Sequence, residues 1–140
     1  MNMPVPRWFS PRRLSPAHQA VLVVKAFPVF DWEVRGSQCV LRGDLQPSDS
    51  SDTYHVNIQY RPDGTPFVFV SGLETAEYLP HSYSNRALCL YHPGIFDWHG
   101  RRTLMNYIVP WTASWLFFYE KWKELGVWLG PKVPHSPTSS

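Results

Sequence analysis

Charge, cysteine and long apolar runs are all scarce in this chain of 140 residues. The formal net charge is only +2 and the basic residues are scattered, which argues against a nucleic-acid-binding surface. The two cysteines, Cys39 and Cys89, are fewer than the disulfide framework of a small secreted domain uses. We therefore expect both thiols to be free in a reducing cytoplasm.

The sequence also lacks the pattern of a membrane or targeting segment. Its longest apolar-rich stretch, YIVPWTASWLFFY at residues 107–119, is interrupted by proline and polar residues and is too short to cross a bilayer. The amino-terminal MNMPVPRWFSPRR has no apolar core of signal-peptide length. We expect no membrane association.

Metal-binding and phosphate-binding motifs are absent as well. The six histidines and two cysteines show neither CxxC nor HxxxH spacing. The stretch DGTP at residues 63–66 lacks the lysine and the length of a phosphate-binding loop. We expect no metal and no cofactor, and the chain has no segment with which to activate a carboxylate using ATP.

Aromatic residues and prolines, by contrast, are abundant. An aromatic content of 16% favours a folded core built on large rings, and 14 prolines favour loops and extended stretches over long helices. The length suits a single domain. We place this domain at residues 15–130, after an irregular arm at 1–14 and before a flexible tail at 131–140.

The amino-terminal half has clear start, turn and strand signals. Ser15–Pro16 is typical of a helix start, with serine as the N-cap and proline at the first helical position. Strand patterns follow at residues 30–45, 53–60 and 66–70, and Gly36–Ser37 would split the first of these into a hairpin. Short links between strands predict an antiparallel meander, and therefore an α+β fold.

The carboxy-terminal half changes character at residue 71. Residues 71–100 have no sustained period, and an irregular stretch that long is usually functional. Residues 101–125 are predicted to be helical, with Pro110 kinking one helix or starting a second, and with Gly126 as the stop. The aromatic stripe from Trp111 to Trp122 is expected to lie in the core.

Cys89 lies within the irregular stretch, between two leucines. Free cysteine is commonly a buried, inert residue, and the leucines favour that interpretation. The polar groups around it favour a reactive thiolate, since His81 or His92 could orient or deprotonate the thiol. Residue types and spacing alone leave both interpretations open. Cys39 is expected to be a core residue.

The order of helix, meander, cysteine loop and helix resembles the ubiquitin-conjugating enzyme fold over about residues 15–125. In that family a histidine-containing motif precedes the active cysteine, a leucine follows it, and a tryptophan lies further on. Here LPHSYSNRALCLYHPGIFDWHGRRTL supplies His81, then Cys89 with its leucine, then Trp98. LQPSDSSDTYHVNIQYRPDGTPFVFV and IVPWTASWLFFYEKWKELGVWLG resemble, more narrowly, the ubiquitin-conjugating-like proteins of bacterial CBASS anti-phage operons, type II short form.

The resemblance implies a bacterial cytoplasmic acyltransferase. Cys89 would form a thioester with the C-terminal tail of a cGAS-like nucleotidyltransferase and pass it to an acceptor lysine of a target protein. His81 would position or deprotonate groups at the site, Asn85 and His92 would support it, and Trp98 would pack the loop against the following helix. Either a separate activating enzyme loads Cys89, or Cys89 attacks a peptide bond in the partner's tail.

The sequence departs from the family at one motif. The His-Pro-Asn tripeptide is absent, and Pro80–His81–Ser82 stands in that region, so no residue takes the asparagine's role by position. Two other interpretations therefore stay open. The chain could be a non-catalytic binding module of the same fold, or a small cysteine hydrolase that uses Cys89 and His81 to process the partner's tail.

Overall fold

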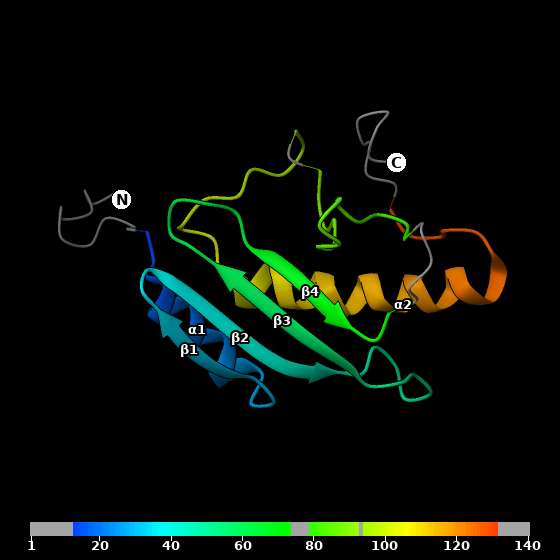
Figure 1. Ribbon diagram of the computed structural model, residues 1–140, viewed down its shortest axis with the longest axis horizontal. Helices are drawn as coiled ribbons and strands as arrows, with labels where there is room; N and C mark the ends of the chain where they lie inside the picture. Colours follow the sequence, from blue (N-terminus) through cyan, green and yellow to red (C-terminus); the bar gives the residue numbers. More distant parts are fainter. Residues whose placement is uncertain (1–12, 74–78, 93, 132–140) are drawn as a thin grey trace, which may run out of the picture.

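The computed structural model describes residues 13–73, 79–92 and 94–131 and shows an α+β fold (Figure 1). Its elements, in chain order, are α1 (Pro16–Ala26), β1 (Asp31–Arg35), β2 (Gln38–Leu45), β3 (Tyr54–Tyr60), β4 (Phe67–Ser71), the π-helical turn η2 (Leu104–Ile108) and α2 (Val109–Leu125).

The described strands form the predicted antiparallel meander, in the order β1-β2-β3-β4. Leu41 pairs with Ile58, and Ile58 with Val68, so one row of side chains crosses three strands on the core face. Alternate residues of β3 are buried, as its sequence pattern predicts. Both helices lie behind the sheet in Figure 1 and contribute to one hydrophobic core.

A strand glycine lets the helix connection approach the sheet closely. The segment after α1 places the buried Phe30 ring directly over Gly43 of β2. A Cβ at Gly43 would lie 2.6 Å from that ring, well inside van der Waals contact. Gly43 is therefore needed for its lack of a side chain.

Helix α1 begins as predicted at Ser15, whose hydroxyl accepts a hydrogen bond from the His18 backbone N–H at 3.1 Å. Its most unusual feature is a fully buried glutamine, Gln19. The Gln19 amide donates to the Arg102 carbonyl at 2.7 Å and accepts from the Leu104 N–H at 2.9 Å. These two bonds join α1 to the start of η2, where unpaired backbone groups are otherwise costly.

The carboxy-terminal helix differs from the prediction at its start. Regular structure begins at Leu104, with one π-helical turn, and α2 follows directly from Val109. Pro110 lies in the first turn of α2, directly after the π turn. The described residues therefore contain one carboxy-terminal α-helix, where one helix kinked at Pro110 or two helices were expected. The predicted stop at Gly126 is confirmed, with the left-handed φ of 76°.

The aromatic stripe of α2 is only partly in the core, which corrects the prediction. Trp115 is buried, Trp111 and Trp122 are half-buried, and Leu125 is 54% exposed. The core face is instead formed by Val109, Thr112, Trp115, Leu116 and Tyr119. The stripe is thus rotated away from the core face, and part of each of Trp111 and Trp122 lies at the protein surface.

Within the described ranges, no helix has the length and apolarity needed to span a membrane. The predicted arm at 1–14 and tail at 131–140 lie almost wholly outside the described residues and stay predictions. The Leu14 N–H donates to the Gly100 carbonyl at 2.8 Å, which fixes the entry to the domain.

Replacing Gln19 with leucine should destabilise the protein. The change leaves the part-buried Arg102 carbonyl and the buried Leu104 N–H without these partners, so we expect a loss of about 2–4 kcal/mol in the free energy of unfolding. Urea denaturation checks this, with the exposed neighbour His18→Leu as the control, which should change stability by roughly 0.5 kcal/mol or less. Equal stabilities of the two variants would contradict the structural role of Gln19.

Candidate active site around Cys89

The segment before Cys89 folds as a narrow hairpin against the edge of the sheet. Ser82 pairs with Leu88 in an isolated antiparallel bridge, and the Tyr83 N–H donates to the Ala87 carbonyl at 2.8 Å. The Leu88 N–H donates to the Val68 carbonyl of β4 at 2.9 Å. The irregular stretch is therefore anchored to the sheet immediately before the cysteine.

His81 holds Cys89 in place through its main chain. Its φ of 49° is left-handed, which turns the backbone so that its carbonyl accepts from two donors. These are the Cys89 N–H at 2.9 Å and the indole N–H of Trp115 at 3.0 Å. One carbonyl thus ties the cysteine to helix α2.

The imidazole of His81 packs on the indole of Trp128, with the ring centroids 4.7 Å apart. Trp128 lies in the segment that follows Gly126, and its ring also lies against Trp115. The ring of His81 is therefore part of an aromatic contact. Its predicted use as a general base stays a prediction.

The Cys89 thiol is enclosed but not isolated. The residue is 3% exposed, its thiol donates to the Tyr91 carbonyl at 3.8 Å, and the Tyr83 hydroxyl hydrogen-bonds to the sulfur. Burial raises the pKa of Cys89 above its ordinary value, and the hydrogen bond from Tyr83 partly offsets that rise. Burial and pairing with Cys89 likewise raise the pKa of Tyr83.

Cys39 provides the contrast. It lies on the core face of β2, is fully buried, and has a pKa raised to about 11 by burial. The prediction that Cys39 is a core residue is confirmed.

Cys89 borders a surface groove of about 460 Å³. The groove is lined by Cys89, Leu90, Trp111, Ser114, Trp115, Phe118, Trp128 and Pro131. Its α2 members recur at intervals of three, one and three residues, so they share one face of the helix. The stripe that the sequence assigned to the core is thus a wall of this groove.

An aromatic cluster fixes the chain after the cysteine. Phe96 contacts Tyr91, Tyr107 and Trp111, with centroid separations of 5.1, 5.1 and 4.8 Å. The Arg102 guanidinium lies 4.3 Å from the centre of the Phe96 ring. The chain is therefore fixed before Cys89 by backbone hydrogen bonds and after Cys89 by ring packing.

The three predicted supporting residues have structural surroundings that differ from one another. The Asn85 side chain accepts from the Ala87 N–H at 2.9 Å, and His92 Nδ1 accepts from the Gly94 N–H at 2.8 Å, so each closes a turn. Trp98 is buried with its ring edge-to-face against Tyr60 of β3, 5.8 Å between centroids. This contact is with the sheet, and the expected packing of Trp98 against the following helix stays a prediction.

The sequence analysis did not select Tyr83, and it did not place Trp128 beside Cys89. Tyr83 is brought to Cys89 by the hairpin, and Trp128 by the left-handed turn at Gly126. The three-four spacing of Trp111, Trp115 and Phe118 was visible, but it did not reveal which face the core would leave uncovered.

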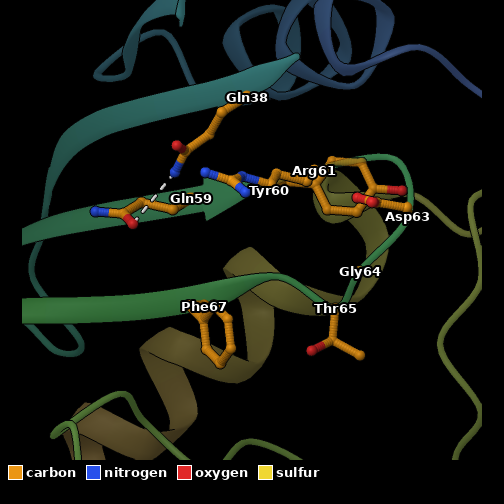
Figure 2. Close-up of a pocket in the computed structure, with 8 residues that line it drawn as sticks. All are labelled: Gln38, Gln59, Tyr60, Arg61, Asp63, Gly64, Thr65 and Phe67. Carbon is orange, nitrogen blue, oxygen red and sulfur yellow. Dashed lines mark hydrogen bonds between the residues drawn. The ribbon is translucent and has the colours of Figure 1, made fainter. Parts of the chain in front are cut away.

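A second pocket, of about 430 Å³, lies at one end of the sheet and shares no lining residue with the groove. Figure 2 shows its residues on the ends of β2 and β3, the turn between β3 and β4, and the start of β4. The Gln38 and Gln59 amides are hydrogen-bonded at 3.2 Å beside the Arg61 guanidinium (Figure 2). Most of its lining residues have polar side chains, and none is a cysteine. Within the described residues, no cluster of three or more potential ligands could hold a metal.

The fold and the site together define a small α+β domain that presents one cysteine at the end of an aromatic groove. Comparison with known families identifies its group. The chain matches the family described as "Type II CBASS E2 protein" over residues 19–136, and it belongs to that family. It is therefore an E2-like component of anti-phage defence, and membership implies the E2-like fold. No curated protein matches the chain.

Replacing Tyr83 with phenylalanine should slow alkylation of Cys89. Because the hydroxyl stabilises the thiolate, its loss raises the thiol pKa further, and a hydrogen bond to a charged group is worth about 1.5–3 kcal/mol. We expect a decrease of about tenfold in the iodoacetamide rate at pH 8, measured at Cys89 by peptide mass spectrometry.

The pH dependence of Cys89 alkylation shows in which direction the Tyr83 hydroxyl shifts the thiol pKa. Alkylation of Cys89 should rise with pH through the thiol pKa, and that rise should move to higher pH in the Tyr83→Phe variant. The Tyr91→Phe variant serves as the control, because the thiol donates to the Tyr91 backbone carbonyl, which the substitution keeps. A rise at the same pH in the Tyr83 variant and the wild type would show that the hydroxyl does not act on the sulfur.

Proposed function

We propose that Cys89 forms a thioester with the C-terminal carboxyl group of a cGAS-like nucleotidyltransferase and transfers that acyl group to a lysine amine of a target protein. One observation carries the proposal: of the two cysteines, Cys89 borders the aromatic groove, whereas Cys39 points into the core. Family membership supports it, because it places the chain among E2-like components of anti-phage defence.

The chemistry consists of two acyl transfers. The Cys89 thiolate attacks the activated carbonyl carbon of the tail, a C–S bond forms, and the bond to the leaving group breaks. The lysine amine then attacks the thioester carbon, a C–N bond forms and the C–S bond breaks. The amine loses a proton, and the sulfur leaves as a thiolate that Tyr83 stabilises.

Loading requires activation from outside the chain. A separate activating enzyme would deliver the tail as a thioester, and the leaving group would be that enzyme's thiolate. The alternative is direct attack of Cys89 on a peptide bond in the partner's tail, with an amine as the leaving group. A reaction of purified chain and partner with no other protein distinguishes the two, because only direct attack yields conjugate there.

His81 is assigned a positioning role through its main chain. Its carbonyl receives the Cys89 N–H and the Trp115 indole N–H, while its ring lies on Trp128. Asparagine tolerates the left-handed conformation that this position requires, whereas alanine does so at a cost.

A non-catalytic binding module is the second candidate. The observation that favours it is the low exposure of Cys89, 3%, together with a pKa raised by burial, since both keep the thiol neutral. In that case the groove would bind the partner's tail and no covalent product would form.

Substituting Cys89 with alanine should abolish conjugation. The matched variant is Cys39→Ala, which removes the other thiol from the core and should retain conjugation at a temperature where it stays folded. The measurement is a denaturing gel of the chain, its operon nucleotidyltransferase and, where present, an activating enzyme. Undiminished conjugate with Cys89→Ala would refute the proposed nucleophile. Release of a shortened partner without conjugate would instead indicate a hydrolase.

Replacing His81 with asparagine should retain conjugation within about threefold, because the backbone geometry persists. His81→Ala should lose more, since a left-handed alanine costs about 1 kcal/mol. Single-turnover transfer across pH 6–9 checks this. If His81→Asn labels Cys89 normally with iodoacetamide but loses transfer and its pH dependence, the imidazole takes part in proton transfer.

A further inference from the structure

We infer that the groove beside Cys89 binds an uncharged, apolar tail of the acyl donor, and that Trp128 determines this specificity. The donor's identity rests on the proposed function, but the groove's preference for apolar chemistry is read from its own residues. Cys89 lines the groove, so a tail seated in it lies beside this residue.

The first argument is the charge of the lining. The eight lining residues include four aromatic rings, a leucine and a proline, and none carries a formal charge. A charged side chain of the tail would lose its hydration here without gaining an opposite charge, which is strongly unfavourable. An apolar side chain gains free energy by leaving water.

The second argument is the arrangement of the rings. Trp111, Trp115 and Phe118 lie on one face of α2, and Trp128 closes the groove from the segment after Gly126. Trp115 already stacks on Tyr119 at an interplanar angle of 11°, and Trp128 lies on the His81 ring. One face of each of these indoles is therefore already covered, and no carboxylate lines the groove to balance the charge of a cationic side chain.

The position of the Trp128 ring is fixed by several contacts, so the ring can discriminate between side chains of the tail. Its indole N–H donates to the Pro131 carbonyl at 3.3 Å, and its ring contacts Trp115 and Phe118. A Cβ at Gly130 would lie 2.6 Å from the Phe118 ring, so this segment packs directly on the helix. Removing the Trp128 indole would widen the groove and expose its floor.

Binding can be measured separately from transfer. The full chain with Cys89→Ala is titrated with four acetylated pentapeptide amides, Ala-X-X-Ala-Gly, in which X is leucine, serine, aspartate or lysine. Two-dimensional NMR of the indole N–H groups reports which tryptophans are affected. We expect the leucine peptide to bind at least about tenfold more tightly than the charged ones, and to shift the signals of Trp111, Trp115 and Trp128.

Two substitutions test the specificity. Trp128→Ala should weaken binding of the leucine peptide about tenfold, whereas Trp122→Ala, which lies outside the groove, should change it less than about twofold. Ser114→Lys adds a charge at an exposed position of the groove and should transfer preference to the aspartate peptide. Ser50→Lys adds the same charge on a distant loop and should leave the preference unchanged.

The outcomes separate the two proposals. Equal affinity for all four peptides, tightest binding of the lysine peptide, or indole shifts outside the groove would overturn the inference, whether or not Cys89 is needed for conjugation. Apolar preference with the expected variant effects supports it, even if Cys89→Ala leaves conjugation intact and the proposed nucleophile is wrong.

Discussion

The site depends on one carbonyl, that of His81. Two donors converge on it, the backbone N–H of Cys89 and the indole N–H of Trp115. The first fixes the cysteine beside the hairpin, and the second fixes both to α2. Because the groove is formed between that helix and the segment carrying Trp128, the carbonyl also sets the position of the thiol relative to the groove.

The environment of Cys89 combines opposing effects. Enclosure by apolar side chains favours the neutral thiol, whereas the Tyr83 hydroxyl favours the thiolate. A thiol that is mostly neutral in the free protein reacts slowly with adventitious electrophiles. A bound acyl donor brings a carbonyl carbon next to the sulfur, so proximity can compensate for a small thiolate fraction. The same burial that makes the thiol look inert is therefore compatible with selective chemistry.

Much of the fold could be predicted because its signals are local. Ser15 caps its helix through neighbouring residues, and the alternation along Tyr54–Tyr60 directly reports one buried face. The site was only partly predictable, because its contacts join distant residues. Cys89 was selected by the family resemblance, but no local pattern indicates that Trp115 bonds to His81, 34 positions away.

Other differences between the prediction and the structure arise because several side chains compete for space in the same core. The aromatic spacing of α2 was read correctly as one helical face, yet smaller residues such as Thr112 and Leu116 occupy the sheet-facing side. The sequence does not indicate that Gln19 is structurally important. Its side chain bonds to backbone groups of Arg102 and Leu104, which only the tertiary fold brings near.

The π-helical turn at Leu104–Ile108 has a consequence for how this chain tolerates length changes. A π turn contains one residue more than the α turn it replaces, and each α-helical residue rotates the chain by about 100°. Deleting one residue there would restore an α turn and leave Trp111 and Phe118 facing the groove, because the turn had absorbed that residue. Deleting a residue between Trp111 and Phe118 would instead rotate Phe118 away by that angle. The π turn is thus a place where the chain can lose one residue without moving the aromatic wall.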